Sequence, residues 1–117
     1  MSPQYRNAEM QTLAPEAPPP EAMAEAAAEA AAYLKTLAHE GRLMILCHLG
    51  GGEKSVGELE MLLGIRQAAV SQQLARLRED GLVAARREGK TVYYRLSDHR
   101  IRQTIGLLYD IFCPRPA

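Results

Sequence analysis

The chain has 117 residues with 14 basic and 14 acidic side chains, so its formal net charge is zero. Hydrophobic residues make up 47% of it and aromatic residues only 5%, which means that a core must be built from aliphatic side chains. No apolar run reaches the roughly 18 residues that cross a bilayer, and the N-terminus lacks the layout of a secretion signal. We therefore expect a cytoplasmic protein with no membrane segment, made of one small domain whose core a second subunit would enlarge.

The neutral total hides an uneven distribution of charge. Residues 1–40 contain two basic and six acidic side chains, whereas residues 67–102 contain eight basic and four acidic ones. The second segment therefore carries a net charge of +4, as expected for a surface that meets phosphate. Charge runs are also common on ordinary solvated faces, so this feature needs support from the order of the elements.

The first part of the chain predicts an arm and two helices. Residues 1–20 are polar, rich in proline and without apolar periodicity, which predicts a disordered arm before a domain over residues 21–117. The Ala- and Glu-rich stretch 21–38 predicts a helix. A second helix over residues 39–49 is predicted to stop at the three glycines that follow it.

The middle of the chain predicts two short helices joined by a turn. Ser55 is suited to cap the first, because Glu58 three residues later completes a capping box, and Gly64 ends this helix. A helix over residues 67–80 follows, with three apolar residues on one face: Val70, Leu74 and Leu77. Two short helices joined by a glycine turn form a helix-turn-helix.

The remaining residues predict a hairpin and a last helix. Residues 82–86 and 92–96 have strand patterns on either side of Gly89. Asp98 begins a helix that runs to about residue 112 and ends before a proline; its apolar residues are Ile101, Ile105, Leu108, Tyr109 and Phe112. The predicted fold class is mainly α (α+β): a winged helix-turn-helix with a two-stranded β-hairpin as the wing.

The exposed faces of the second short helix predict a DNA-reading surface. Gln and Ser suit base edges because they both donate and accept hydrogen bonds. The predicted contacts around this helix are Gln67, Ala68, Ser71, Gln72 and Arg76. The hairpin adds three cations expected to position the duplex without reading its sequence: Arg86, Arg87 and Lys90. Singly, each could be an ordinary surface residue, but the order helix-turn-helix, hairpin, helix favours DNA binding.

Several blocks resemble one known family. They are Val56-Gly57-Glu58-Leu59, Gly64-Ile65, Ala69-Val70-Ser71-Gln72-Gln73-Leu74, Leu77-Arg78-Glu79-Asp80-Gly81-Leu82-Val83, Arg86-Arg87-Glu88-Gly89-Lys90 and Tyr93-Tyr94-Arg95-Leu96. Over residues 33–113 the chain resembles the ArsR/SmtB family of winged-helix repressors. The resemblance implies a homodimer, formed by the first and last helices, that binds double-stranded operator DNA.

The chain departs from the family at two positions. The family often has Ser where this chain has Arg66, and often His where it has Gln73. Arg66 cannot supply a capping oxygen and opposes the helix dipole. We therefore expect its side chain to contact a phosphate.

Metal sites of the family are not matched. Its Cys-x-Cys-like pair falls on Ser55-Val56-Gly57. In its last-helix site, Asp98 matches the first residue of an Asp-x-His pattern, but Arg100 replaces the His, and Ile111 and Pro114 stand where the later ligands would be. Three isolated histidines remain, which are more often surface or internally satisfied groups than ligands: His39, His48 and His99. We expect no metal site and no cofactor.

Cys47 and Cys113 are the only thiols, 66 positions apart and in no CxxC pair. A cysteine on an apolar stripe, such as Cys47, is by itself more often a packing residue. Cys113 lies just outside a helix, where packing makes little demand for sulfur. Residues 45–49 and 109–113 resemble the persulfide-responsive, SqrR/BigR-like subgroup of the family. The resemblance implies that reactive sulfur species join two such cysteines and that DNA is then released.

The leading prediction is therefore a dithiol repressor, not an enzyme, that leaves DNA when persulfide or polysulfide bridges Cys47 and Cys113. The bridge is either a disulfide or contains additional sulfur. One alternative is a metal- or metalloid-responsive repressor that also uses His48. Two others are a thiol sulfur-transfer enzyme, which the lack of an acid/base cluster disfavours, and a protein-interaction module that never meets DNA.

Overall fold

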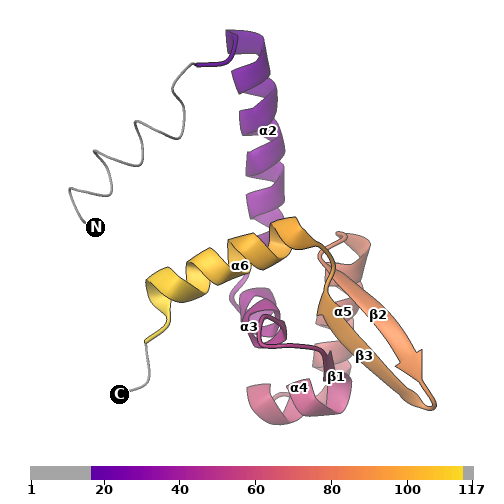
Figure 1. The fold of residues 1–117 in the computed structure, drawn as a ribbon. Coiled ribbons are helices and arrows are strands. Elements are labelled where there is room, and N and C mark those ends of the chain that lie inside the picture. Colours follow the sequence, from indigo (N-terminus) through magenta and orange to yellow (C-terminus); the bar gives the residue numbers. More distant parts are fainter. Residues whose placement is uncertain (1–16, 115–117) are drawn as a thin grey trace. The chain divides into compact units, whose positions relative to one another are not determined.

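The computed structural model describes residues 17–114, and Figure 1 shows its elements. In chain order they are α2 (Pro20–Leu37), α3 (Glu40–Leu49), β1 (Lys54–Ser55), α4 (Val56–Leu63), α5 (Gln67–Glu79), β2 (Val83–Glu88), β3 (Thr91–Leu96) and α6 (His99–Phe112). This arrangement confirms the predicted class, mainly α with a small antiparallel sheet. Within the described residues, no helix is both long and apolar enough to cross a membrane.

The chain divides into two units, one ending at Tyr33 and the other beginning at Leu34. Most of the first described unit is α2, whose Ala- and Glu-rich sequence forms the predicted helix. Pro20 begins it, in the position where the fixed backbone angle of proline suits a helix start. The predicted disordered arm falls largely on residues 1–16, outside the described part of the chain, so that arm stays a prediction. All the other elements belong to the second unit.

Capping interactions determine where α4 begins and ends. The Ser55 Oγ accepts a hydrogen bond from the Glu58 N–H at 3.1 Å, and the Glu58 Oε1 accepts one from the Ser55 N–H at 2.9 Å. The predicted capping box is thus confirmed. Gly64 ends the helix with a φ of 68°, a left-handed conformation that glycine adopts without steric cost.

An aliphatic core holds α5 in place. Its residues Val70, Leu74 and Leu77 are fully buried, as the spacing predicted, and the helix contacts α3, α4 and β2. The other buried hydrophobic residues are Leu37, Ile45, Leu46, Leu49, Leu59, Leu82, Val83, Leu96, Ile101 and Ile105. Truncating one such leucine to alanine typically costs about 2–5 kcal/mol, so the position of α5 is strongly constrained by packing.

The wing is the predicted hairpin plus a strand that was not predicted. Strands β2 and β3 pair antiparallel around Gly89, which has a φ of 62°. The short strand β1 pairs antiparallel with β3, so the sheet order is β1-β3-β2 rather than two-stranded. Two residues are too few to show an alternating pattern. Through β1 the start of α4 is attached to the wing.

Asp98 caps the start of helix α6, because its side chain accepts a hydrogen bond from the Ile101 N–H at 3.0 Å. Ile101 and Ile105 are buried, and α6 contacts α3; both helices are labelled in Figure 1. The sequence also predicted Leu108, Tyr109 and Phe112 on the apolar face of this helix. The structure leaves Tyr109 and Phe112 exposed, together with Leu107 and Ile111. The second half of α6 therefore presents an uncovered apolar surface.

Candidate functional site

Helix α5 presents the predicted DNA-reading residues to solvent. All five are exposed: Gln67, Ala68, Ser71, Gln72 and Arg76. The opposite face of the helix is buried in the core, so these side chains are clear of their own domain. Short polar side chains in such a position can reach base edges in a major groove. Their contact with DNA stays a prediction.

Arg66 lies immediately before α5 and makes no capping hydrogen bond with its side chain, as expected from its type. A carboxylate from α4 serves this helix end instead, because the Glu60 Oε2 accepts a hydrogen bond from the Gln67 N–H at 3.1 Å. Negative charge at a helix N-terminus is favourable. The exposed Arg66 side chain is thus not needed for capping and is available for the predicted phosphate contact.

The wing carries its three predicted phosphate contacts on exposed positions: Arg86, Arg87 and Lys90. The Arg86 guanidinium forms ion pairs with Glu53 at 2.8 Å and Glu88 at 2.6 Å. It also lies 4.8 Å from the centre of the Tyr93 ring. The hydrogen bond from Arg86 lowers the pKa of Glu53, and the two carboxylates raise the pKa of Arg86. A phosphate would compete with these contacts at Arg86, so the other two cations are better placed to meet the duplex.

Replacing Gln72 and Lys90 in turn tests the division between reading and positioning. Gln72→Ala is expected to reduce discrimination between operator and random DNA by about 1–3 kcal/mol, because a base contact is lost. Lys90→Ala is expected to weaken binding to both duplexes alike, because phosphates are the same in every sequence. Competition titrations followed by fluorescence anisotropy measure both effects. Equal losses of discrimination in the two variants would contradict this assignment.

Cys47 and Cys113 line one groove between α3 and α6. Both are free thiols and both are partly exposed. The groove has a volume of about 790 Å³, and its other lining residues are Ala38, His39, Glu40, Leu43, Met44, His48, Lys54, Leu62 and Tyr109. The structure thus brings together two cysteines that are far apart in the sequence.

The charge of Cys113 also acts on the Cys47 thiol. Burial raises the pKa of the Cys47 thiol above its ordinary value, and the negative charge of Cys113 raises it further. Since the thiolate is the reactive form of cysteine, Cys47 is less nucleophilic at neutral pH than an exposed cysteine. Both thiols thus belong to one groove, and the charge of Cys113 acts on Cys47.

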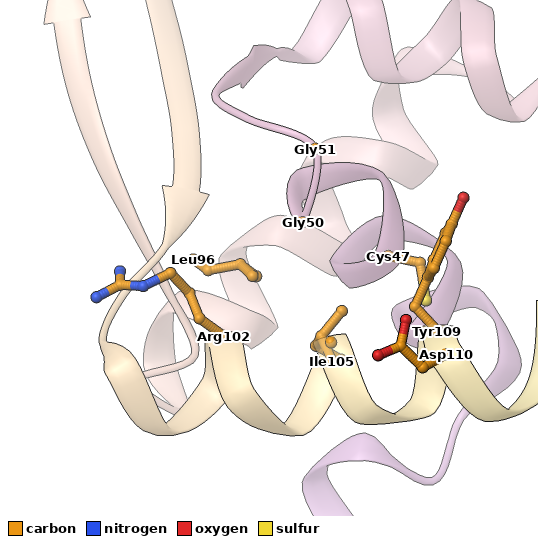
Figure 2. A pocket seen from close by; sticks show the side chains of 9 residues that line it. Cys47, Gly50, Gly51, Leu96, Arg102, Ile105, Tyr109 and Asp110 are labelled. Atoms are coloured by element: carbon orange, nitrogen blue, oxygen red, sulfur yellow. The ribbon is translucent and has the colours of Figure 1, made fainter.

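A smaller cavity of about 290 Å³ also reaches Cys47. Figure 2 shows Cys47 on α3 beside Tyr109 and Asp110 of α6, with Ile105 one turn earlier on the same helix. Cys47 and Tyr109 line both the groove and this cavity. Small molecules can therefore approach the Cys47 thiol next to the Tyr109 ring.

Metal ligands are not clustered in the part of the chain that the structure describes. Among residues 17–114 there is no group of three or more His, Cys, Asp or Glu side chains that could hold a metal ion. His48 nevertheless lines the same groove as the two cysteines, so replacing it distinguishes a metalloid response from a sulfur response.

Comparison with known proteins identifies the family. The model of the bacterial regulatory protein arsR family matches residues 39–85. The chain is 54% identical over 92 residues to the biofilm growth-associated repressor of Agrobacterium fabrum, covering 79% of each chain. The chain belongs to the ArsR family. This ArsR-family protein is therefore a DNA-binding transcriptional regulator and not an enzyme, as the resemblance implied.

Other relatives and solved structures agree with this assignment. The ArsR-family chain is 47% identical over 91 residues to the transcriptional activator HlyU of Vibrio cholerae, covering 78% of this chain and 84% of that one. The crystal structure of the transcriptional repressor BigR from Xylella fastidiosa matches with a TM-score of 0.77 and 48% identity, over 83% of this chain and 98% of that one. The predicted winged-helix fold is confirmed.

Proposed function

We propose that this regulator is a homodimeric repressor that binds operator DNA when Cys47 and Cys113 are reduced and leaves it when reactive sulfur species bridge them. The observation that carries the proposal is the groove between α3 and α6, which both free thiols line. The raised pKa of Cys47 supports it, because the charge of Cys113 is one of its causes. A relative with 54% identity is named a repressor, which supports the direction of regulation.

The bridge can form by two displacements at sulfur. One thiolate attacks an inner sulfur of a polysulfide R–S–S–S–S–R, an S–S bond breaks, and RS⁻ leaves, so that the cysteine carries the remaining chain. The second thiolate attacks the sulfur next to the first cysteine, and RSS⁻ leaves. The two cysteines lose two electrons and two protons, the polysulfide gains the electrons, and one added sulfur stands between the two Sγ atoms. Attack of the second thiolate on the Sγ itself would leave a plain disulfide.

We assign the first attack to Cys113 and the second to Cys47. Burial raises the pKa of Cys47, and the charge of a Cys113 thiolate raises it further, which leaves less of Cys47 in the reactive form for the first step. Once Cys113 has reacted, it no longer carries that charge. The pKa of Cys47 then falls, which makes Cys47 more reactive for the second step.

A bridge between the two cysteines would affect DNA binding through the helices that carry them. Helix α3 packs against both helices of the helix-turn-helix, α4 and α5. Helix α6 carries the exposed apolar surface that we assign to the dimer interface. Joining α3 to the end of α6 therefore couples the DNA-binding surface to the partner subunit. A change of about 1.4 kcal/mol in binding free energy already alters affinity tenfold.

The pKa of Cys47 tests whether the charge of Cys113 acts on the Cys47 thiol. Cys113→Ser is expected to lower the pKa of Cys47, because it removes the negative charge that raises it. The pKa stays above that of an exposed thiol, because burial is unchanged. The measurement is the rate of iodoacetamide labelling at Cys47 as a function of pH, followed by peptide mass spectrometry. An unchanged or higher pKa in the variant would show that the thiols are not coupled.

Anisotropy titration of an operator selected from random duplexes tests the proposed function. Reduced wild type is expected to bind, sodium tetrasulfide to release it, and a reductant to restore binding. Release by zinc or arsenite with no response to tetrasulfide would identify a metalloid sensor instead. Turnover of a persulfide donor without DNA binding would identify a sulfur-transfer enzyme.

A further inference from the structure

A polar hollow adjoins α5 where the first turn of α3 meets it. Its volume is about 350 Å³, and five side chains line it: His39, Arg42, Gln72, Gln73 and Arg76. Each of these side chains carries N–H donors, two are permanently cationic, and no carboxylate is among the lining residues. Such a set is complementary to an anion with several acceptor oxygens.

The His39 ring caps the start of α3 through one of its two nitrogens. Its Nδ1 accepts a hydrogen bond from the Arg42 N–H at 3.3 Å and thereby caps α3. A neutral imidazole that accepts at Nδ1 carries its proton on Nε2, which is then a donor. The N-terminus of α3 adds the positive end of a helix dipole at the same place.

Close packing builds the wall of the hollow. A Cβ atom at Gly41 would lie 3.2 Å from the His39 Cε1 and 3.7 Å from the Gln73 Nε2. The start of α3 therefore lies directly against the Gln73 side chain of α5, with little room between them. Arg42 is anchored by an ion pair from its Nη1 to the Asp80 Oδ2 at 3.6 Å, and its side chain is only 16% exposed. That contact uses one nitrogen and leaves the other N–H groups of the guanidinium for a ligand.

We propose that the hollow binds one phosphate of the DNA backbone and so sets the register of α5 on the duplex. Gln72 and Arg76 belong both to the hollow and to the predicted DNA-reading face of α5, so the bound phosphate lies next to the bases being read. Contacts to phosphate position a protein without recognising sequence. The proposal rests on DNA binding through α5, which is part of the proposed function. It adds His39, Arg42 and Gln73 to the DNA-binding residues.

Two conservative variants test the phosphate site. Gln73→Glu keeps the size of the side chain but places a negative charge against the phosphate. His39→Asn keeps a good capping residue and removes the Nε2–H donor. Met61→Glu, at an exposed position of α4, is the control for the added negative charge. Thermal unfolding followed by circular dichroism confirms that each variant is folded.

The measured quantity is the Kd for operator and for random duplex over a range of salt concentrations. Gln73→Glu is expected to weaken binding to both duplexes by about tenfold to a hundredfold and to reduce the salt slope by about one. His39→Asn should weaken both severalfold, and Met61→Glu should have no effect. Wild-type affinities and slopes in both hollow variants would overturn the phosphate site while leaving the regulator function intact. A wild type that binds neither duplex would instead overturn the proposed function.

Inorganic phosphate distinguishes DNA from a free anion as the ligand. Titration of the DNA-free wild type is followed through the NMR resonances of His39. Weak binding that operator DNA displaces supports the proposal. Tight binding of inorganic phosphate, together with unchanged DNA affinity in Gln73→Glu, would make the hollow an effector site and contradict it.

Discussion

Cys47→Ser and Cys113→Ser are each expected to leave DNA binding by the reduced protein nearly unchanged and to abolish its release by polysulfide. Neither cysteine lies on α5 or the wing, so DNA contacts are kept. Closing a bridge needs both sulfurs, because the second displacement requires a thiolate that the serine cannot supply. A single persulfide adds bulk to the groove but joins no helices. Anisotropy titrations before and after sodium tetrasulfide measure the effect.

A packing role for the cysteines predicts a different pattern. Cys47→Ser would then mildly destabilise the fold through a partly buried hydroxyl, and polysulfide would not affect wild-type binding. His48→Ala is the control within the same groove, because it removes a possible metal ligand and leaves both thiols. We expect this variant to respond to tetrasulfide like the wild type. Full and reversible release of a single-cysteine variant would rule out the two-thiol mechanism.

The double variant Leu107→Glu and Ile111→Glu is expected to dissociate the protein into monomers and to weaken operator binding by about a hundredfold or more. The two residues are four positions apart on α6 and are 56% and 61% exposed, so they share one uncovered face. Two carboxylates there would have to be buried in a dimer, which is costly without partners. A monomer also engages only one half of an operator, so the two recognition helices no longer reinforce each other.

Sedimentation velocity at micromolar concentration measures the oligomeric state of this variant. Met61→Glu is the control, because Met61 is a large apolar residue on α4 that is 85% exposed. It is expected to leave the dimer intact. A double variant that still sediments as a dimer would show that the exposed face of α6 is not the interface.

Much of the fold could be predicted because local chemistry determines it. Ser55 with Glu58 forms the capping box, Gly64 adopts the left-handed conformation that ends α4, and Asp98 caps α6. The spacing of the buried residues on α5 reveals its inner face. Each of these signals involves residues within a few positions of one another, where backbone geometry limits the possibilities.

Contacts between residues far apart in the sequence could not be predicted from such local signals. Arg86 carried a strand pattern and a positive charge, and nothing nearby indicated that Glu53, 33 positions earlier, would bind it. The pairing of β1 with β3 brings these residues together, and β1 is too short to be recognised. His39 and Gln73 likewise meet only because α3 packs on α5. The resemblance to a family, rather than any local pattern, indicated that Cys47 and Cys113 would share a site.

Mass spectrometry of the wild-type protein before and after tetrasulfide, intact and after digestion into peptides, tests whether Cys47 and Cys113 become bridged. We expect one species in which peptides containing Cys47 and Cys113 are joined within a single chain, with the loss of two hydrogens and the gain of any inserted sulfur atoms. The same sample should no longer bind operator DNA and should regain both its mass and its affinity after reduction. Release of DNA with the two peptides still separate, or a bridged protein that keeps full affinity, would contradict it.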